Sequence, residues 1–277
     1  MSFFDFVEIG TSDFETEIQK NDGRRGLSIE PIKYYLDRLP DNPTCTKLNL
    51  AVSDYTGTCT INYLSGEMIA AHELPWWVKG CNTINSYHPG VSRLCQERGW
   101  DITKVATSDI VEVVPLLNIM QRVSGVYLLK IDTEGHDVVI LSQFAKDMLT
   151  QSNAMWPHVV YFESNVLTPA EDVTRVIDEF AAYDVIERGH DTKLQLNLKK
   201  LKNKQGFTQS LHKYYIMNYP DNYNVSSLPH ANTLEGAQAY CVEHQCAGVT
   251  FQDNIYQVRD GPYLKFYDMD IWSWVYV

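Results

Sequence analysis

The fold is decided by a stretch near the start of the chain, which begins FFDFVEIGTSD (residues 3–13) and ends GLSIEP (residues 26–31). Its first seven residues are largely apolar, with aromatic and β-branched side chains, and the run stops at Gly10. Such a run predicts a buried parallel strand that leads into a tight turn. Residues 14–20 are expected to form a short helix, and residues 26–31 a second strand. The stretch therefore predicts a strand–turn–helix–strand unit of an α/β protein.

The turn after the first strand has the features of a ligand-binding loop. Gly10 can take a positive φ and lets the backbone approach a ligand closely. Thr11, Ser12 and Asp13 can cap the following helix, whose free N–H groups face the same ligand. About 20 residues further on, Glu30 ends the second strand, where a carboxylate can accept hydrogen bonds from both hydroxyls of a ribose. These residues predict an adenosine-type nucleoside, bound across the carboxyl ends of the strands.

The charges around this turn favour S-adenosylmethionine over a dinucleotide. The dinucleotide fingerprint has three glycines, which allow a pyrophosphate to sit against a helix N-terminus. The chain has one glycine here, flanked by Glu8 and Asp13. Two carboxylates repel a pyrophosphate but suit an amino group and a sulfonium charge. The alternative is that this turn is purely structural, with its polar groups hydrogen-bonded within an α/β protein that binds no ligand here.

A third strand is expected at residues 47–53, with its end facing the adenine. Residues 59–64 are expected to pair with it as a hairpin across residues 54–57, and residues 32–39 have helical spacing of apolar positions. The expected cofactor contacts are Glu8, Gly10, Thr11, Ser12, Asp13, Glu30, Pro31, Ile32, Asn49, Ala51, Val52 and Asp132.

The strongest internal feature is VYLLKIDTEGHD (residues 126–137), a buried strand that ends in two carboxylates around a glycine turn and a histidine. Residues 157–165 and 184–191 repeat the scheme of a strand with a polar end. Because the carboxyl ends of parallel strands meet at one sheet edge, the pattern predicts a reaction centre there. Helix capping is the alternative for Glu134 and His136. The expected catalytic residues are Asp132, Glu134, His136, Glu163 and His190.

Residues 65–98 break the alternation of strands and helices and are rich in aromatic and amide side chains. A long connection of this kind is more often a lid or binding loop than a core element. Tryptophan and tyrosine faces stack on sugar rings, and asparagine and histidine bond hydroxyls. The alternative is an insertion packed on the sheet, with Trp76 and Trp77 in its core. The expected substrate contacts are Trp76, Trp77, Asn82, Asn85 and His88, together with Asn165.

Composition narrows the classes of partner. The 277 residues are 44% hydrophobic and 21% charged, which indicates a globular chain. A net charge of −12 argues against a nucleic acid or an anionic membrane as partner, since both need basic patches. The start of the chain lacks the features of a signal peptide, and no run approaches the ~20 apolar residues of a membrane span. We therefore expect a cytoplasmic protein, with its six cysteines as free thiols.

The composition changes after Tyr219, which predicts two domains at residues 1–219 and 220–277. Residues 220–232 are rich in Asn, Pro and Ser and are expected to be a linker. Residues 233–241 should form a capped helix, followed by short strands with an aromatic core. This module could bind a glycan or a protein, or simply cap the first domain. The sequence does not decide among these roles, and it does not decide the oligomeric state.

Three further elements are expected before that boundary. Residues 109–123 are expected to contain a helix, and residues 169–182 another. Residues 212–218 are expected to form the antiparallel strand at the end of the main sheet.

Four motifs carry a family resemblance: VEIG (residues 7–10), IEP (29–31), NLAVS (49–53) and above all LKIDTEGH (129–136). With these motifs, residues 4–218 resemble the FkbM family of S-adenosylmethionine-dependent O-methyltransferases. The resemblance implies a Rossmann-like class I methyltransferase sheet of seven strands, mostly parallel with one antiparallel. It also implies methyl transfer to a hydroxyl, often on a sugar. The family often carries aspartate where Glu8 stands. The tail is similar to small PAN- or WSC-like modules, which implies an α+β accessory module.

Methyl transfer to a sugar hydroxyl needs a general base within hydrogen-bond reach, or a divalent metal that lowers the hydroxyl pKa. His136 or His190 could serve as the base, and His88 is a further candidate. A non-catalytic carbohydrate-binding protein and a nicotinamide-dependent oxidoreductase are the rival interpretations. The residues that could hold Mg²⁺ or Mn²⁺ through oxygen ligands are Asp132, Glu163 and Asn165.

Overall fold

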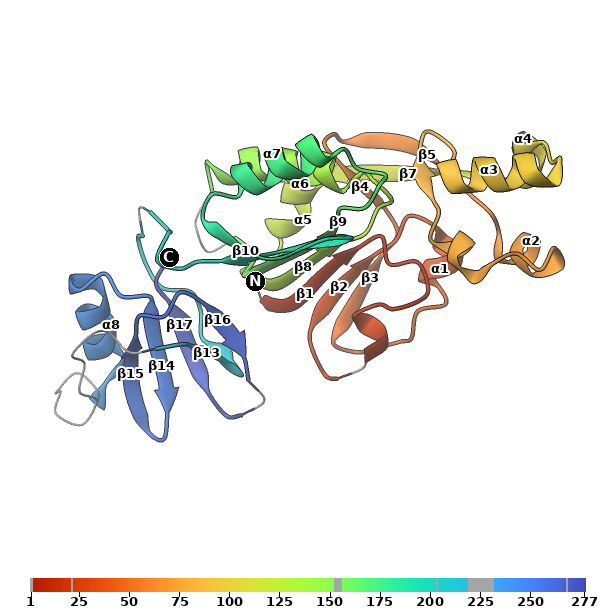
Figure 1. Cartoon of the computed structure of the whole chain (residues 1–277). Helices are drawn as coiled ribbons and strands as arrows, with labels where there is room; N and C mark the ends of the chain where they lie inside the picture. The colour runs from red at the N-terminus through yellow and green to blue at the C-terminus, as the bar shows by residue number, and fades with distance from the viewer. Residues whose placement is uncertain (1, 21, 152–155, 203, 219–231, 268) are drawn as a thin grey trace.

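The structure, a computed structural model, describes residues 2–20, 22–151, 156–202, 204–218, 232–267 and 269–277. Its largest element is a seven-stranded sheet in the order β10-β11-β9-β8-β1-β2-β3 (Figure 1). The strands are β1 (Phe3–Ile9), β2 (Gly26–Ile29), β3 (Cys45–Leu48), β8 (Gly125–Ile131), β9 (Val159–Glu163), β10 (Tyr183–Arg188) and β11 (Asp191–Leu196). All neighbours from β3 to β9 pair in parallel, whereas β11 is antiparallel to both β9 and β10.

This arrangement confirms the mostly parallel α/β sheet with one antiparallel strand. The strand predicted from residues 3–9 is β1, and it lies in the middle of the sheet between β2 and β8. The identity of the antiparallel strand was predicted wrongly, because β11 takes that place and residues 212–218 lie outside this sheet. The strand β11 follows β10 directly through a tight turn, so a hairpin supplies the antiparallel direction.

Helices α5 (Leu116–Met120), α6 (Asp137–Met148) and α7 (Ala170–Glu179) cover one face of the sheet (Figure 1). Their apolar sides bury Leu141, Phe144 and Val176 against the central strands, where Leu129 and Val160 are fully buried. Full burial of a side chain of this size contributes about 2 kcal/mol. The helix expected at residues 169–182 is therefore confirmed as α7.

The two helices expected near the start of the chain are shorter than predicted. Only Ile18–Lys20 (η1) is helical within residues 14–20, and only Lys33–Leu36 (α1) within residues 32–39. Ser12 and Glu15 have φ values of 47° and 56°, which a right-handed helix does not accept. Ile18 nevertheless packs against Leu36 in a small cluster.

A second sheet, β4-β7-β5-β6, consists of β4 (Ala51–Ser53), β5 (Gly57–Tyr63), β6 (Thr83–Ile84) and β7 (Thr107–Pro115). The predicted hairpin is wrong, because β7 lies between β4 and β5 and pairs with both. The helix predicted at residues 109–123 is also wrong over its first half, which is β7. Val111 and Val113 are buried there while Ile110 is 79% exposed, which is the two-residue alternation of a strand.

The connection between β5 and β7 is a largely helical insertion with its own small core. It contains α2 (Gly66–Ala71), η2 (Trp76–Lys79), α3 (Pro89–Arg98) and α4 (Ile102–Val105). Its core is built from Leu64, Val78, Val91 and other apolar residues. The insertion extends from the carboxyl-terminal side of the main sheet (Figure 1).

The last part of the chain forms a small module around helix α8 (Leu234–Glu243). Its strands form the sheet β12-β17-β14-β15 and the pair β13-β16. They are β12 (Leu211–His212), β13 (Tyr214–Ile216), β14 (Gly248–Gln252), β15 (Ile255–Arg259), β16 (Leu264–Phe266) and β17 (Trp272–Val275). Thr233 caps α8 as expected, since its side chain accepts a hydrogen bond from the N–H of Gly236. Residues 220–231 of the expected linker lie outside the described residues.

Strands β12 and β13 precede the expected boundary at residue 219 but pair with β17 and β16 of the module. The hydroxyl of Tyr214 in β13 donates to Asp5 Oδ1 at 2.6 Å, so the module contacts the main sheet at β1. Tyr214 also packs on Phe3 and Tyr127. Residues 211–216 therefore pair with the strands of the module although they precede the expected boundary.

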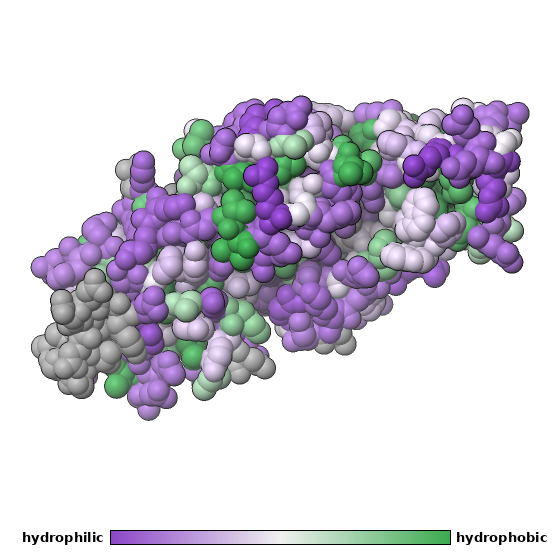
Figure 2. Space-filling model, in the orientation of Figure 1, coloured by the Kyte–Doolittle hydropathy of each residue, from purple (hydrophilic) through white to green (hydrophobic). Residues whose placement is uncertain are grey.

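The surface is mainly hydrophilic, with apolar side chains gathered over β10 below α7 (Figure 2). Val185 and Ile186 on this edge strand are 44% and 48% exposed. Within the described part of the chain, every helix is too short or too polar to cross a bilayer.

Candidate active site

A cavity of about 490 Å³ opens at the carboxyl ends of β1, β2, β8 and β9. This is the sheet edge at which open α/β folds bind their ligands, and the volume is typical of a small-molecule site. Fourteen of the residues expected to contact cofactor or substrate, or to act in catalysis, line this cavity. They are Gly10, Thr11, Ser12, Glu30, Pro31, Ala51, Val52, Trp76, Trp77, Asn82, Asp132, Glu134, Glu163 and His190.

Gly10 sits where the backbone after β1 lies against the backbone after β8. Its φ is 77°, and a Cβ atom at this position would stand 1.8 Å from the backbone oxygen of Asp132. The N–H of Gly10 donates to Ile29 O, and the N–H of Asp132 donates to Ile9 O. Glycine at position 10 therefore lets the ends of β1, β2 and β8 come together around the cavity.

Glu30 is fixed by the backbone at the end of β2. Its carboxylate accepts hydrogen bonds from the N–H of Ser12 at 2.7 Å and from the N–H of Ile32 at 2.8 Å. Burial raises the pKa of Glu30 to about 7, although the two N–H groups oppose this rise. Asn49 does not line the cavity; its amide donates to the carbonyls of Glu30 and Pro31 and thereby holds the strand end.

Glu8 and Asp13 do not face the cavity, contrary to the expectation that their charges meet the ligand. Glu8 is buried, with Oε1 2.8 Å from Lys130 Nζ and Oε2 accepting from the N–H of Glu17. Asp13 forms ion pairs with Lys79 and Arg38. Both carboxylates are therefore occupied by protein cations.

Apolar side chains form one wall of the cavity next to Glu30. Ala51 and Val52 belong to β4, and Ile61 to β5, so the second sheet supplies this wall. Leu50 and Ile84 complete it. A carboxylate beside an apolar wall suits a nucleoside, because the ribose offers hydroxyls and the base offers an apolar ring face.

The end of the cavity at β8 and β9 is acidic. Asp132 and Glu163 end β8 and β9, and burial and neighbouring carboxylates raise their pKa values to about 7 and about 8. Glu163 Oε1 accepts from the side-chain amide of Asn165, while its buried Oε2 has no hydrogen-bond partner among the described residues. Tyr161 also lines this end and donates from its hydroxyl to Asp191. Two carboxyl groups of this end are therefore partly protonated near neutral pH.

Asp137, which sequence reasoning left out of the site, holds the two strand ends together. It is fully buried at the start of α6. Its carboxylate accepts from the N–H and hydroxyl of Thr133 and from the N–H of Glu163. Burial raises its pKa to about 6. Asp137 directly follows the DTEGH motif (residues 132–136), and this position could have identified it as a site residue from the sequence.

Asn165 does not join Asp132 and Glu163 in an oxygen-ligand set. Its Oδ1 accepts from the N–H of Leu167 at 2.8 Å, and its nitrogen points at Glu163. The amide therefore presents a donor to Glu163 rather than an oxygen to the cavity. The metal set expected from the sequence is not assembled by these side chains.

The histidines and the remaining amide expected in the site lie in different places. His136 Nε2 is 2.9 Å from the hydroxyl of Ser53, outside the cavity, and burial lowers its pKa. His190 is exposed at the cavity mouth. Asn85, with a φ of 56°, accepts from the N–H of Thr60 and turns away from the cavity. These placements leave His190 as the only one of these three residues on the cavity wall.

The insertion closes the acidic end. The ring of Trp76 is 66% exposed and meets Phe14 edge-on at 5.6 Å, while Trp77 is 39% exposed. Lys79, which follows on η2, pairs with Asp13, and its carbonyl accepts from the hydroxyl of Ser12 at 3.4 Å. Trp76 and Trp77 are therefore cavity residues rather than the core residues of the alternative interpretation.

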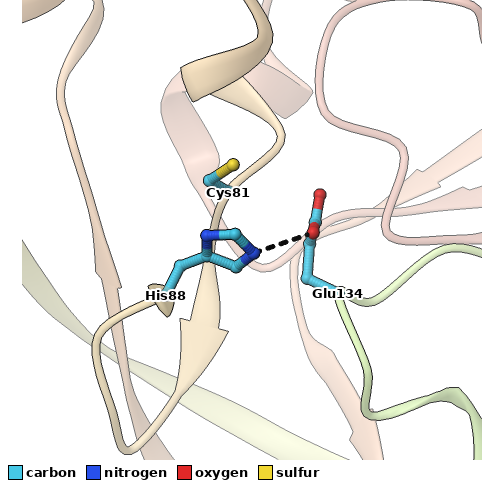
Figure 3. Close-up of side chains that lie close together, drawn as sticks. All are labelled: Cys81, His88 and Glu134. Carbon is cyan, nitrogen blue, oxygen red and sulfur yellow. Dashed lines mark ion pairs between the residues drawn. The ribbon is translucent and has the colours of Figure 1, made fainter. Parts of the chain in front are cut away.

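His88 and Glu134 meet between the insertion and the end of β8. His88 Nε2 lies 3.2 Å from Glu134 Oε2, and Cys81 Sγ lies beside them, with all three ligand atoms within 4.8 Å of one another (Figure 3). A Cys–His–Glu set resembles a zinc site, but His88 Nδ1 accepts the N–H of Gly90 at 3.1 Å. A metal on Nε2 would require a proton on Nδ1, which that contact disfavours. Burial and the charges of Glu134 and Glu163 raise the pKa of the Cys81 thiol to about 12, so it stays protonated.

Several cavity residues were not predicted from the sequence, among them Phe14, Glu15, Lys130, Tyr161 and Asp191. Strand register would have revealed two of them. Glu8, Lys130 and Tyr161 are register partners on β1, β8 and β9, so their side chains leave the same face in one row.

The strand order with a single antiparallel strand, and the cavity at the carboxyl ends of the parallel strands, define a methyltransferase-like α/β fold. A family model described as the methyltransferase FkbM domain matches residues 7–187. This span is more than half of the chain, and the protein therefore belongs to the FkbM methyltransferase family. No curated protein and no solved structure matches the chain.

Proposed function

We propose that the protein uses S-adenosylmethionine to methylate a hydroxyl, and that the hydroxyl belongs to a sugar or glycan. The observation that carries this proposal is the two-ended cavity. One end has the buried Glu30 carboxylate beside the apolar wall of Ala51 and Val52, and the other has carboxylates below exposed tryptophans. A nucleoside donor and a polyhydroxylated acceptor fit these two ends.

The charges lining the cavity fit a sulfonium donor better than a pyrophosphate. Six lining residues are acidic and one is a lysine, and that lysine is paired with Glu8. When bound, the donor would supply an electrophilic methyl group on a positively charged sulfur. Gly10, Glu30 and Asp132 would hold it, since they lie at the three adjacent strand ends. A phosphate group has no unpaired lysine or arginine to meet in the described lining.

The protein contributes position and proton transfer. In-line methyl transfer depends on holding the acceptor oxygen close to the methyl carbon, and such positioning lowers the barrier substantially. A hydroxyl also needs a group within hydrogen-bond reach to accept its proton. Acidic residues line this end of the cavity, and Glu134 is the one that we take as the candidate for this role.

The acceptor end suits a neutral sugar. Trp76 and Trp77 present exposed ring faces, which cover the apolar face of a pyranose. Asn82 and His190 add groups that bond hydroxyls. An acceptor with a phosphate or carboxylate next to the reacting hydroxyl would be repelled by the carboxylates below.

Calorimetry tests the donor, with S-adenosylhomocysteine and NADH titrated in parallel. Binding of S-adenosylhomocysteine alone is expected, and a Glu30→Gln variant should weaken it at least about tenfold, or ~1.4 kcal/mol. Glu67→Gln, on the exposed side of α2, is the matched control and should bind normally. Binding of NADH instead would contradict the proposal.

A radiolabelled methyl donor tests the acceptor, with methyl glycosides of the common neutral hexoses and deoxyhexoses offered as a panel. Label is expected in an alkali-stable ether of at least one glycoside. Labelling of a basic peptide or a lysine side chain, with none of any glycoside, would overturn the assignment to a sugar hydroxyl.

A further inference from the structure

Glu134 lines the cavity, whereas His88, which was expected to contact substrate, is not part of the described lining and instead lies against Glu134. The geometry of this pair gives the two residues different roles. His88 is buried at the start of α3, and its Nδ1 accepts the N–H of Gly90. The neutral ring therefore carries its proton on Nε2. That nitrogen is buried and has no hydrogen-bond partner among the described residues. It lies 3.2 Å from Glu134 Oε2, an ion-pair distance without the geometry of a hydrogen bond, so this carboxylate is the group that the Nε2–H can meet after a small rotation (Figure 3).

Glu134 is held by strained backbone. Its φ is 55° and that of Gly135 is 90°, so two successive residues adopt positive φ between β8 and α6. A non-glycine residue in this region costs of order 1 kcal/mol, and such residues gather at functional sites. The turn aims the Glu134 side chain at the insertion, where it lines the cavity.

Two glycines of the insertion make room for the pair. A Cβ atom at Gly80 would stand 3.2 Å from Glu134 Oε1, and one at Gly90 would stand 3.1 Å from the His88 ring. Both distances are tighter than ordinary contacts. The insertion is therefore shaped to approach Glu134 closely from one side.

We propose that Glu134 is the group that takes the proton of the acceptor hydroxyl, and that His88 is a positioning residue that orients the Glu134 carboxylate through Nε2. This inference rests on the proposed function and deepens it. Glu134 Oε2 lies 3.2 Å from His88 Nε2. No described residue donates a hydrogen bond to Oε1, and Glu134 lines the cavity, so Oε1 can accept from a substrate.

The proton and electrons balance in one step. The acceptor O–H bond breaks and its proton bonds to Glu134 Oε1. The lone pair of the acceptor oxygen forms the bond to the methyl carbon, and the pair of the former carbon–sulfur bond stays on sulfur. Proton transfer to a positioned carboxylate contributes roughly 10²–10⁴-fold to such a rate.

The other candidate bases are less well arranged. Burial and the neighbouring carboxylates raise the pKa of Glu163 to about 8, so much of it is protonated at neutral pH, and Asn165 occupies its Oε1. His136 faces Ser53, outside the cavity. His190 is exposed, and no described contact orients its ring. The titratable groups that face Glu134 are His88, Cys81, Asp132 and Glu163.

Two variants at position 88 separate the cap of α3 from the contact with Glu134. In His88→Asn the shorter amide can still accept the N–H of Gly90 and cap α3, but it cannot reach Glu134. In His88→Gln the longer amide can donate to Glu134, but the cap is lost. A positioning role predicts that His88→Asn lowers kcat about tenfold, whereas His88→Gln keeps most of kcat.

Turnover of the methyl glycosides is measured in the full chain, with Glu134→Gln expected to lose at least about 100-fold of kcat. Glu97→Gln, exposed on the same helix α3, is the matched control and should retain full activity. Binding of S-adenosylhomocysteine should stay within about threefold in each variant. Retention of more than a third of the activity in Glu134→Gln overturns the proposal, as does loss of activity in EDTA that Zn²⁺ restores.

Nitrogen-15 NMR of labelled histidine tests the pairing without any acceptor. The signal that disappears in His88→Asn should show the Nε2–H tautomer, and its Nε2–H resonance should shift in Glu134→Gln. An Nδ1–H tautomer overturns the proposal. If the wild-type chain fails to bind S-adenosylhomocysteine, the proposed function fails, and this NMR result still decides whether the His88–Glu134 pair exists.

Discussion

Lys130 Nζ lies 2.8 Å from Glu8 Oε1, across the neighbouring parallel strands β8 and β1. The two residues are register partners, and Glu8 is 1% exposed. Burial raises the pKa of Glu8 even though Lys130 opposes the rise. The pair removes from the cavity a carboxylate that was expected to face the ligand, and it neutralises the one lysine of the described lining.

Lys130→Met should destabilise the fold by about 3 kcal/mol, because it leaves the buried Glu8 carboxylate without its cation. Adding Glu8→Gln should recover most of the loss, since a neutral amide can still accept the N–H of Glu17. Urea unfolding of the wild type, both single variants and the double variant measures this. A cost below about 1 kcal/mol for Lys130→Met would show that the pair is not buried in solution.

Gly10→Ala should unfold the cofactor loop and abolish binding of S-adenosylhomocysteine, because its Cβ would stand 1.8 Å from Asp132 O. Gly23→Ala is the matched control. Gly23 has nearly the same φ, 79°, but a Cβ atom there meets nothing within 4 Å. It should cost only about 1 kcal/mol of unfolding free energy. Equal effects of the two variants, measured by calorimetry and urea unfolding, would contradict the close approach.

Local patterns sufficed to predict the central strands. Residues 3–9 and 126–132 are largely apolar runs that end in polar turns, and such runs occur chiefly in parallel sheets. Because the carboxyl ends of parallel strands meet at one edge, Gly10, Glu30 and Asp132 could be assigned to a single cavity from the sequence alone, and all three line it. The binding end of the site was therefore predictable in outline.

Pairing between distant segments was not predictable in the same way. Strand β7 separates β4 from β5, and nothing local to residues 51–63 reveals a partner that arrives some 50 residues later. The direction of a side chain also depends on such partners. Glu8 turns to Lys130, and Asn165 turns to Glu163, because of neighbours that only register or a turn brings close.

The free energy of unfolding should fall by at least about 1 kcal/mol as the pH rises from 7 to 8. Burial raises the pKa values of Glu30 and Asp132 to about 7 and that of Glu163 to about 8. Carboxyl groups in an unfolded chain titrate near ~4, so the folded chain holds protons in this window that the unfolded chain has released. The pKa values of the buried His136 and His158 are lowered and lie below the window.

Urea unfolding at pH 7.0, 7.5 and 8.0 measures this slope, and Glu163→Gln should flatten it, because that variant has no proton to lose at position 163. The control is Glu97→Gln, whose slope should match the wild type. A stability that rises with pH across this window would show that these carboxyl groups are solvated rather than buried.

Trp76→Ala should weaken binding of the acceptor and leave the fold intact. The ring is 66% exposed and contacts Phe14 only edge-on, so its removal should change the free energy of unfolding by less than about 0.5 kcal/mol. Loss of a stacking face is worth ~1 kcal/mol, which predicts a rise in KM for the glycoside of roughly fivefold to tenfold. Binding of S-adenosylhomocysteine should not change, and Trp76→Phe should recover most of the KM. A lower kcat with an unchanged KM in Trp76→Ala would contradict this prediction. It would mean that the ring orders the catalytic groups and does not stack on the sugar.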